Sequence, residues 1–295
     1  MRKIGYTLLS LVLLAACSSK DVSSPDFTVK LRSAALHAGD TAFFDITGAP
    51  YNMTFYSGEP GKQYKYRTRT SAEGIPQLQF TSYMQNGTQA NTLQLLVSTD
   101  FSATYDSASI YKATWTDITS RAKLSTGTNN TASGIVDLSD FVNGKPVYIA
   151  FKYTGQQNTS VQRTWTIPTF TIANILKEDG SSQPVISALA DAVFTAVNMK
   201  GTAVKWNIST TQMQIAGGVA NSPATENWAV SKGLMLNRVV PDPGTSIKKI
   251  TDNGISAYFY VYKTAGSYTA TFVAANTTVY DSKTDVKEIP VTVNP

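Results

Sequence analysis

The chain has 295 residues, of which 15% are charged and 42% are hydrophobic, with a formal net charge of +5. This length is enough for two domains that each bury a core. The positive surplus is small and scattered along the chain, which argues against a nucleic-acid partner.

The N-terminus has the pattern of a bacterial export signal. Arg2 and Lys3 precede a mostly apolar run over residues 4–16, which is too short to cross a membrane. We therefore expect residues 1–16 to be a signal peptide. The stretch LAAC, which ends at Cys17, also resembles a bacterial lipobox, so Cys17 is predicted to be acylated and held by outer-membrane lipid. With this single cysteine committed to lipid, disulfides, zinc thiolate sites and cysteine nucleophiles are excluded.

Residues 17–26 follow as a polar segment with one proline and no periodicity, which predicts a lipidated tether. Lys20 and Asp21 partly resemble the residues that promote outer-surface display of lipoproteins in the Bacteroides group. We therefore expect the protein to be lipid-anchored in the outer membrane and to face the cell exterior.

Beyond the tether, the sequence predicts β-strands almost throughout. Runs rich in β-branched and aromatic residues are separated by turns that contain glycine, and they cover 27–31, 41–47, 93–97, 146–153, 164–172 and 256–262. Only residues 185–197 have the spacing of a short helix, although their β-branched ends leave a strand open. The predicted fold class is all-β, with two β-sandwiches.

The two ends of the mature chain resemble parts of one fold. The segment from Tyr262 to Val293 resembles the last strands of a PKD-type, immunoglobulin-like sandwich, and residues 41–61 resemble its early strands. This implies a discontinuous PKD-like domain formed by 27–73 and 235–295. Residues 74–234 follow the order of a galactose-binding-like jelly roll of the choice-of-anchor kind, which implies a circularly permuted, inserted domain.

Several long stretches of the chain form a recognisable set, among them FYSGEPGKQYKYRTRT, LLVSTDFSATYD, SGIVDLSDFVNGKPVYIAFKYTG and ENWAVSK. Through these stretches, residues 17–295 as a whole resemble the Bacteroides lipoprotein family known by the label DUF5017. The resemblance implies an anchored surface protein of a kind often encoded beside glycan-uptake systems. It implies no particular activity.

Catalysis has little support from the residue types. His37 is the single histidine and no Gly-x-Ser-x-Gly pattern is present, which argues against a serine hydrolase and against a zinc site. A glycoside hydrolase stays possible if two carboxylates pair among Asp100, Asp106, Asp117, Glu178 and Asp179. No cofactor is expected except a structural calcium, whose candidate ligands are Asp100, Asp106, Asp137 and Asp140. A turn or strand-end role is more usual for each of these residues.

Non-catalytic glycan binding is the favoured function, in support of a polysaccharide-uptake complex. Sugars are gripped by exposed aromatic rings and by planar polar groups, and the candidates in predicted loops are Tyr64, Tyr66, Arg67, Tyr105 and Trp228. The other three tryptophans are expected in the core, and tyrosines 258, 260 and 262 are expected to alternate with Phe259 and Val261 across a sheet. The competing hypothesis is a structural or adhesive protein whose strands meet other proteins edge to edge.

Overall fold

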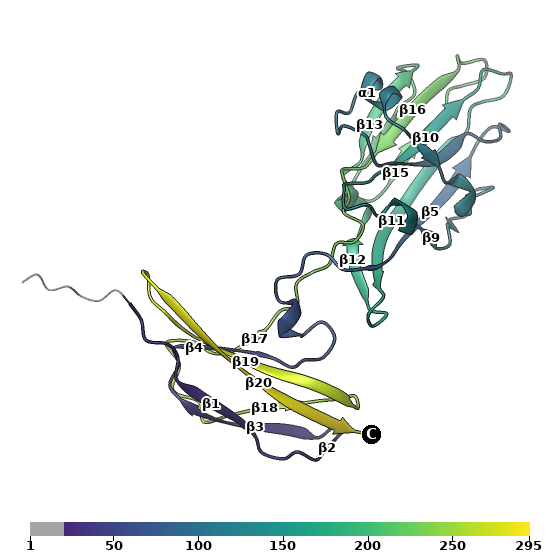
Figure 1. Cartoon of the computed structure of the whole chain (residues 1–295). Helices are drawn as coiled ribbons and strands as arrows, with labels where there is room; N and C mark the ends of the chain where they lie inside the picture. Colours follow the sequence, from purple (N-terminus) through teal and green to yellow (C-terminus); the bar gives the residue numbers. More distant parts are fainter. Residues whose placement is uncertain (1–20) are drawn as a thin grey trace, which may run out of the picture. The chain divides into compact units, whose positions relative to one another are not determined.

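The computed structural model describes residues 21–295, which form two compact units (Figure 1). Unit 1 contains the described residues up to Arg67 together with Asp242–Pro295, and unit 2 is Thr68–Pro241. In Figure 1 the purple strands from the start of the chain and the yellow strands from its end therefore lie in the same unit. Nearly all regular structure is β, which confirms the predicted fold class. The assignment of the units as PKD-like and galactose-binding-like stays a prediction.

Unit 1 contains two sheets. The three-stranded sheet has the order β1–β3–β18, from strands β1 (Phe27–Leu31), β3 (Thr41–Gly48) and β18 (Ala257–Val261). The five-stranded sheet has the order β17–β4–β19–β20–β2, from β17 (Thr245–Lys248), β4 (Asn52–Tyr56), β19 (Gly266–Thr277), β20 (Ser282–Asn294) and β2 (Leu36–His37). Only the short β2–β20 pair is parallel among these strands.

Period-two alternation places the core of unit 1. In β3, Ala42, Phe44 and Ile46 are buried while Phe43 is exposed, and Phe44 packs against Phe55 of β4 with ring centroids 5.8 Å apart. The predicted alternation near the C-terminus is confirmed, since Phe259 and Val261 are exposed while the intervening tyrosines turn toward the core. Burial of these aromatic rings is the main stabilising term of the unit.

Unit 2 also contains two sheets. The first has the order β13–β16–β10–β6–β7, from β13 (Thr195–Lys200), β16 (Thr225–Val230), β10 (Tyr148–Gly155), β6 (Leu93–Ser98) and β7 (Thr116–Asp117). The second has the order β14–β15–β11–β5–β8, from β14 (Trp206–Ile208), β15 (Met213–Ile215), β11 (Thr164–Leu176), β5 (Gly74–Gln85) and β8 (Thr131–Ala132). Strand β12 (Ser182–Ile186) also pairs with β11, and β9 (Val136–Asp137) with β5.

Two apolar clusters stabilise unit 2. The main cluster unites side chains of both sheets, among them Phe80, Phe151 and Phe170. A smaller cluster lies on the opposite face of the first sheet, where Phe101, Ile110 and Trp228 are buried. The segment between β6 and β7 contributes Phe101 and Ile110, so the sheet is covered on both faces.

Residues 185–197, for which the sequence left a short helix or a strand open, form no α-helix. This stretch forms the end of β12, the 3₁₀ turn η4 (Leu189–Ala192) and the start of β13, and Val193 between them has a left-handed φ of 46°. The α-helix is instead α1 (Ser107–Lys112), whose first turn is capped by the Asp106 carboxylate accepting from the Ser109 N–H at 2.7 Å. The remaining 3₁₀ turns are η1 (Tyr64–Tyr66), η2 (Thr119–Arg121) and η3 (Ser139–Phe141). No helix of the described part combines the length and apolar character that crossing a bilayer requires.

Candidate binding site

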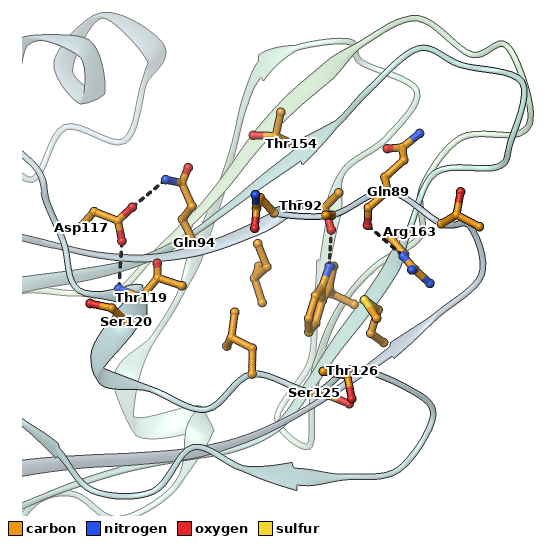
Figure 2. A pocket seen from close by; sticks show the side chains of 17 residues that line it. Gln89, Thr92, Gln94, Asp117, Thr119, Ser120, Ser125, Thr126, Thr154 and Arg163 are labelled. Atoms are coloured by element: carbon orange, nitrogen blue, oxygen red, sulfur yellow. Dashed lines mark hydrogen bonds between the residues drawn. The ribbon is translucent and has the colours of Figure 1, made fainter.

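Unit 2 has a wide, open cavity with a volume of about 1030 Å³ (Figure 2). Its wall is made by the end of β5, the loop 86–92, the start of β6, the β7–η2 turn and the loop 124–126. The adjoining ends of β10 and β11 complete it through Thr154, Arg163 and Trp165. The lining residues therefore come from three regions of the sequence, 84–94, 117–126 and 154–165, which the fold brings together.

One side of the cavity is formed by an amide and a carboxylate that bind each other. The Gln94 side chain donates from Nε2 to Oδ2 of Asp117 at 2.7 Å, and the Thr119 N–H donates to the other carboxylate oxygen at 2.9 Å. Figure 2 shows both bonds on one wall. Burial acts to raise the pKa of Asp117, but hydrogen bonds from Thr119 and Gln94 and the charge of Lys152 hold it below its ordinary value. Asp117 is therefore an ionised acceptor at neutral pH.

The opposite side is the loop 86–92, which is held in one conformation. Arg163 donates to the backbone oxygens of Asn86 at 2.7 Å and Gln89 at 3.0 Å. The side chain of Gln89 is buried and exchanges two hydrogen bonds with the backbone of Gln156, at 2.7 and 2.9 Å. Thr92 accepts from the indole N–H of Trp165 at 2.8 Å. A loop held by these contacts would lose little conformational freedom if it bound a ligand.

The cavity wall combines polar and apolar surface in similar amounts, and Asp117 and Arg163 are its charged residues. Hydroxyls and amides predominate along the rim, and the residues that supply them are Thr88, Asn91, Gln94, Thr119, Ser120, Thr126 and Thr154. Apolar atoms come from Met84, Leu93, Leu124 and Trp165. Groups of this kind can hydrogen-bond a hydroxyl-rich, uncharged ligand, whose apolar C–H faces contact the apolar part of the wall.

Trp228, a predicted sugar-stacking residue, is buried. It lies in β16 rather than in a loop, its exposed fraction is 4%, and Trp115 packs on it with ring centroids 5.1 Å apart. Its indole N–H donates to Glu226 at 2.9 Å, and Glu226 in turn pairs with Lys152 at 3.3 Å. The prediction that Trp228 is an exposed loop residue is therefore wrong, and a ring that is 4% exposed cannot stack on a sugar.

Tyr105 lies beside the same small cluster. Its ring packs edge-on against Phe101, with centroids 5.5 Å apart, and its hydroxyl donates to the Ser231 carbonyl at 3.1 Å. Burial raises the pKa of the phenol. The structure thus brings Tyr105 and Trp228 into one cluster, and neither lines the cavity.

The other three candidates lie together in unit 1, in and directly after η1. Tyr64 packs on Tyr56 with centroids 5.3 Å apart, and the Arg67 guanidinium covers the Tyr64 ring at 3.9 Å. Tyr66 lies under the Lys65 ammonium at 4.5 Å. Tyr64 and Lys65 also line a smaller cavity of about 370 Å³ in unit 1. Tyr64, Tyr66 and Arg67 are therefore close neighbours, but a cation already covers each ring.

The four candidate calcium ligands have local partners. Asp100 accepts from Ser98 and Thr114, and Asp106 caps α1. Asp137 accepts from the Ser139 N–H at 2.8 Å, and Asp140 forms a two-bond pair with Arg121 at 2.7 and 2.8 Å. Within residues 21–295, no three His, Cys, Asp or Glu side chains gather as a metal site would need. Cys17 lies outside the described residues.

Most of the cavity residues were not predicted from the sequence. Among them, only Asp117 was a candidate functional residue, as a possible carboxylate of a glycoside hydrolase. The missed residues that carry polar groups include Gln89, Asn91, Gln94, Thr154 and Arg163. A signal was present in the stretch NGTQANT at 86–92, which is unusually rich in amides and hydroxyls between two strands. Such a stretch is ordinary loop composition, so it could not be told from a turn without its neighbours in space.

Comparison with known families matches residues 16–194 to the model described as "Domain of unknown function (DUF5017)". The match runs from before β1 through η4, so it includes the first strands of unit 1 and every segment that lines the cavity. No curated protein and no solved structure matches the chain. Because the matched stretch exceeds half of the 295 residues, the chain belongs to the DUF5017 family.

Proposed function

We propose that unit 2 binds a neutral glycan in the cavity between loop 86–92 and the β7–η2 turn. The observation that carries the proposal is the lining itself, in which hydroxyls and amides stand beside apolar surface of similar extent. The ionised Asp117 accepts hydrogen bonds from Gln94 and Thr119 and retains capacity for a sugar hydroxyl. A volume of about 1030 Å³ and an open mouth suit part of a polymer better than a small enclosed metabolite.

Binding without cleavage is supported by the number of acids at the site. Glycoside hydrolysis in its usual form needs two carboxyl groups on either side of the scissile bond. Asp117 is the single acid among the residues that line the cavity. Of the other candidates, Glu178 pairs with Arg69 and Asp179 accepts from the Ser181 N–H at 2.9 Å.

The test uses the soluble chain, residues 18–295, in affinity electrophoresis against a panel of neutral polysaccharides. The variants Gln94→Ala and Thr154→Val each remove one polar group from the cavity wall. We expect each to weaken the retention of a bound polysaccharide about tenfold, the usual effect of one lost hydrogen bond to a ligand. Gln212→Ala is the matched control, because this exposed amide lies in a turn that does not line the cavity.

The control must keep the wild-type affinity, and all three variants must keep the wild-type circular dichroism spectrum. Retention that is equally strong in Gln94→Ala, Thr154→Val and wild type would place the glycan elsewhere. No retention of any polysaccharide by the wild-type chain would remove the proposal.

We further propose that acyl chains on Cys17 anchor the protein in the outer membrane with its units outside the cell. The support is the lipobox-like LAAC stretch after a short apolar run. Replacing Cys17→Ser should abolish labelling by radioactive palmitate and move the protein from the membrane to the soluble fraction, because several acyl chains give stable anchoring. Ser18→Ala is the matched control and should stay in the membrane. Retention of Cys17→Ser in the membrane would contradict the lipid anchor. Protection of the wild-type protein from protease added to whole cells would contradict its outward orientation.

A further inference from the structure

Strand β18 of unit 1 leaves one edge of its sheet open. It pairs with β3 on one side, and it is the last strand in the order β1–β3–β18. Its sequence from Ala257 to Val261 is AYFYV, with no charge, no proline and no break in register. An uncharged, regular edge strand is a template for another strand.

Other edge strands of the described chain carry features that discourage such pairing. Strand β1 has the exposed Lys30, and β12 contains Pro184. The register of β13 and of β17 is broken by bulges. Strands β2, β7, β8 and β9 have two residues each, and β14 has three. Strand β20, which β2 covers only at its end, carries Lys283, Lys287 and Pro290. These are the usual protections of sheet edges, and β18 has none of them.

The residues that flank β18 show which of its backbone groups face β3 and which face the open edge. The carbonyls of Ser256 and Tyr262 accept from Ile46 and Gly39 on the β3 side, both at 2.8–2.9 Å. Because successive residues of a strand point their backbone groups to opposite sides, residues 258 and 260 also face β3. The N–H and C=O groups of Ala257, Phe259 and Val261 therefore face the open edge.

We propose that β18 pairs antiparallel with β18 of a second copy of this chain, about a twofold axis at Phe259. The strand is nearly palindromic in residue type, as a twofold interface requires. Antiparallel pairing sets Phe259 against Phe259, Tyr258 against Tyr260, and Ala257 against Val261. The outward groups of 257, 259 and 261 then meet their equivalents in the hydrogen-bonded positions of an antiparallel ladder.

The side chains beside this edge fit the same partner. Phe259 has an exposed fraction of 66% and lies next to Phe43, which is 41% exposed, with ring centroids 6.4 Å apart. Pairing would join these rings to those of the second copy in one continuous apolar row. The charged side chains Arg32 and Asp45 neutralise each other on this face at 2.6 Å, and Asp45 lies opposite Ala257 in the β3–β18 register. An interface of one short strand is small, and we expect a dimer with a Kd of about 10 µM to 1 mM.

The first test is sedimentation equilibrium of residues 18–295 over a concentration series that spans this range. The wild type should shift from monomer to dimer. Phe259→Lys places two like charges on the axis, and Ala257→Pro removes one outward N–H at the first residue of the strand. Each should raise the dimer Kd at least about tenfold. Val279→Lys is the matched control, since this residue is 91% exposed in the β19–β20 turn, and it should associate like the wild type.

The second test is cross-linking, which reports the register. Residues 18–295 contain no cysteine, so Phe259→Cys introduces the only thiol. A directly opposed pair has Cα atoms about 5.5 Å apart, which a disulfide can span. Oxidised glutathione should therefore convert Phe259→Cys to a covalent dimer much faster than Val279→Cys. A wild type that stays monomeric throughout the series, a dimer that Phe259→Lys leaves intact, or equal cross-linking of the two cysteine variants would each overturn the proposal.

Discussion

Replacing Phe151→Ala is expected to lower the free energy of unfolding of unit 2 by about 3–5 kcal/mol, the usual cost of removing a buried phenylalanine ring. Phe151 lies in β10 with an exposed fraction of 0%. Its ring contacts those of Phe80, Phe170 and Phe194, with centroids 5.2, 6.2 and 5.9 Å apart. These neighbours come from the facing sheet and from the segment before β13. Filling the space left by the missing ring would therefore require several strands to move at once.

Urea denaturation followed by tryptophan fluorescence measures this loss, since all four tryptophans lie in unit 2. Tyr111→Ala is the control. Tyr111 is 66% exposed on α1, and its removal should change the unfolding free energy by no more than about 0.5 kcal/mol. A loss below about 1 kcal/mol for Phe151→Ala would mean that this ring is not at the centre of the core.

Replacing Gly58→Ala is expected to destabilise unit 1 by about 2–5 kcal/mol, from left-handed backbone strain and overpacking together. Gly58 has φ +84°, and an added Cβ would lie 2.5 Å from the Thr269 carbonyl oxygen and 2.7 Å from its nitrogen. Thr269 has little room to move away, because it is paired opposite Pro290 of β20, and two residues further along β19 the pairing with β4 begins at Thr271. Gly58 is held in place as well, because hydrogen bonds fix both of its neighbours. The backbone oxygen of Ser57 accepts from the Tyr262 hydroxyl at 2.9 Å, and the Glu59 carboxylate accepts from the Tyr260 hydroxyl at 2.6 Å.

The variant Gly61→Ala separates the cost of left-handed backbone strain from the cost of the clash with Thr269. Gly61 lies in the same turn with φ +78°, but nothing lies within 4 Å of an added Cβ. It should therefore show only the backbone cost of about 1–2 kcal/mol. Hydrogen exchange of peptides from β4 and β19, measured across a urea series, reports unit 1 for both variants. Equal losses in Gly58→Ala and Gly61→Ala would show that the clash with Thr269 is relieved.

Local pattern predicted the strands because each strand has one face toward a core. In β18 and at the residue after it, residues 258, 260 and 262 turn inward, and the sequence has Tyr at each of these alternate positions. Period two is a property of the chain itself, so it can be recognised before the partner strand is known.

Local pattern misled where neighbours in space override spacing. Val185, Leu189 and Val197 recur as on one face of a helix, yet β12 pairs with β11 and β13 pairs with β16, so sheet hydrogen bonds replace helical ones. Trp228 stands in a polar stretch that resembles a loop, but Trp115 and the neighbouring strands enclose it. Burial of a large ring depends on residues that are distant in the sequence, so a short stretch of sequence cannot predict it.

The sequence by itself determined the all-β class, the alternating faces of the strands and the family, because these depend on residues close together in the chain. Only the tertiary structure decided the candidate site. Gln94, Asp117, Thr154 and Arg163 come from four separate segments, and none forms a motif with its own neighbours. The same holds for the open edge of β18, since a strand becomes an edge only when no other strand pairs beside it.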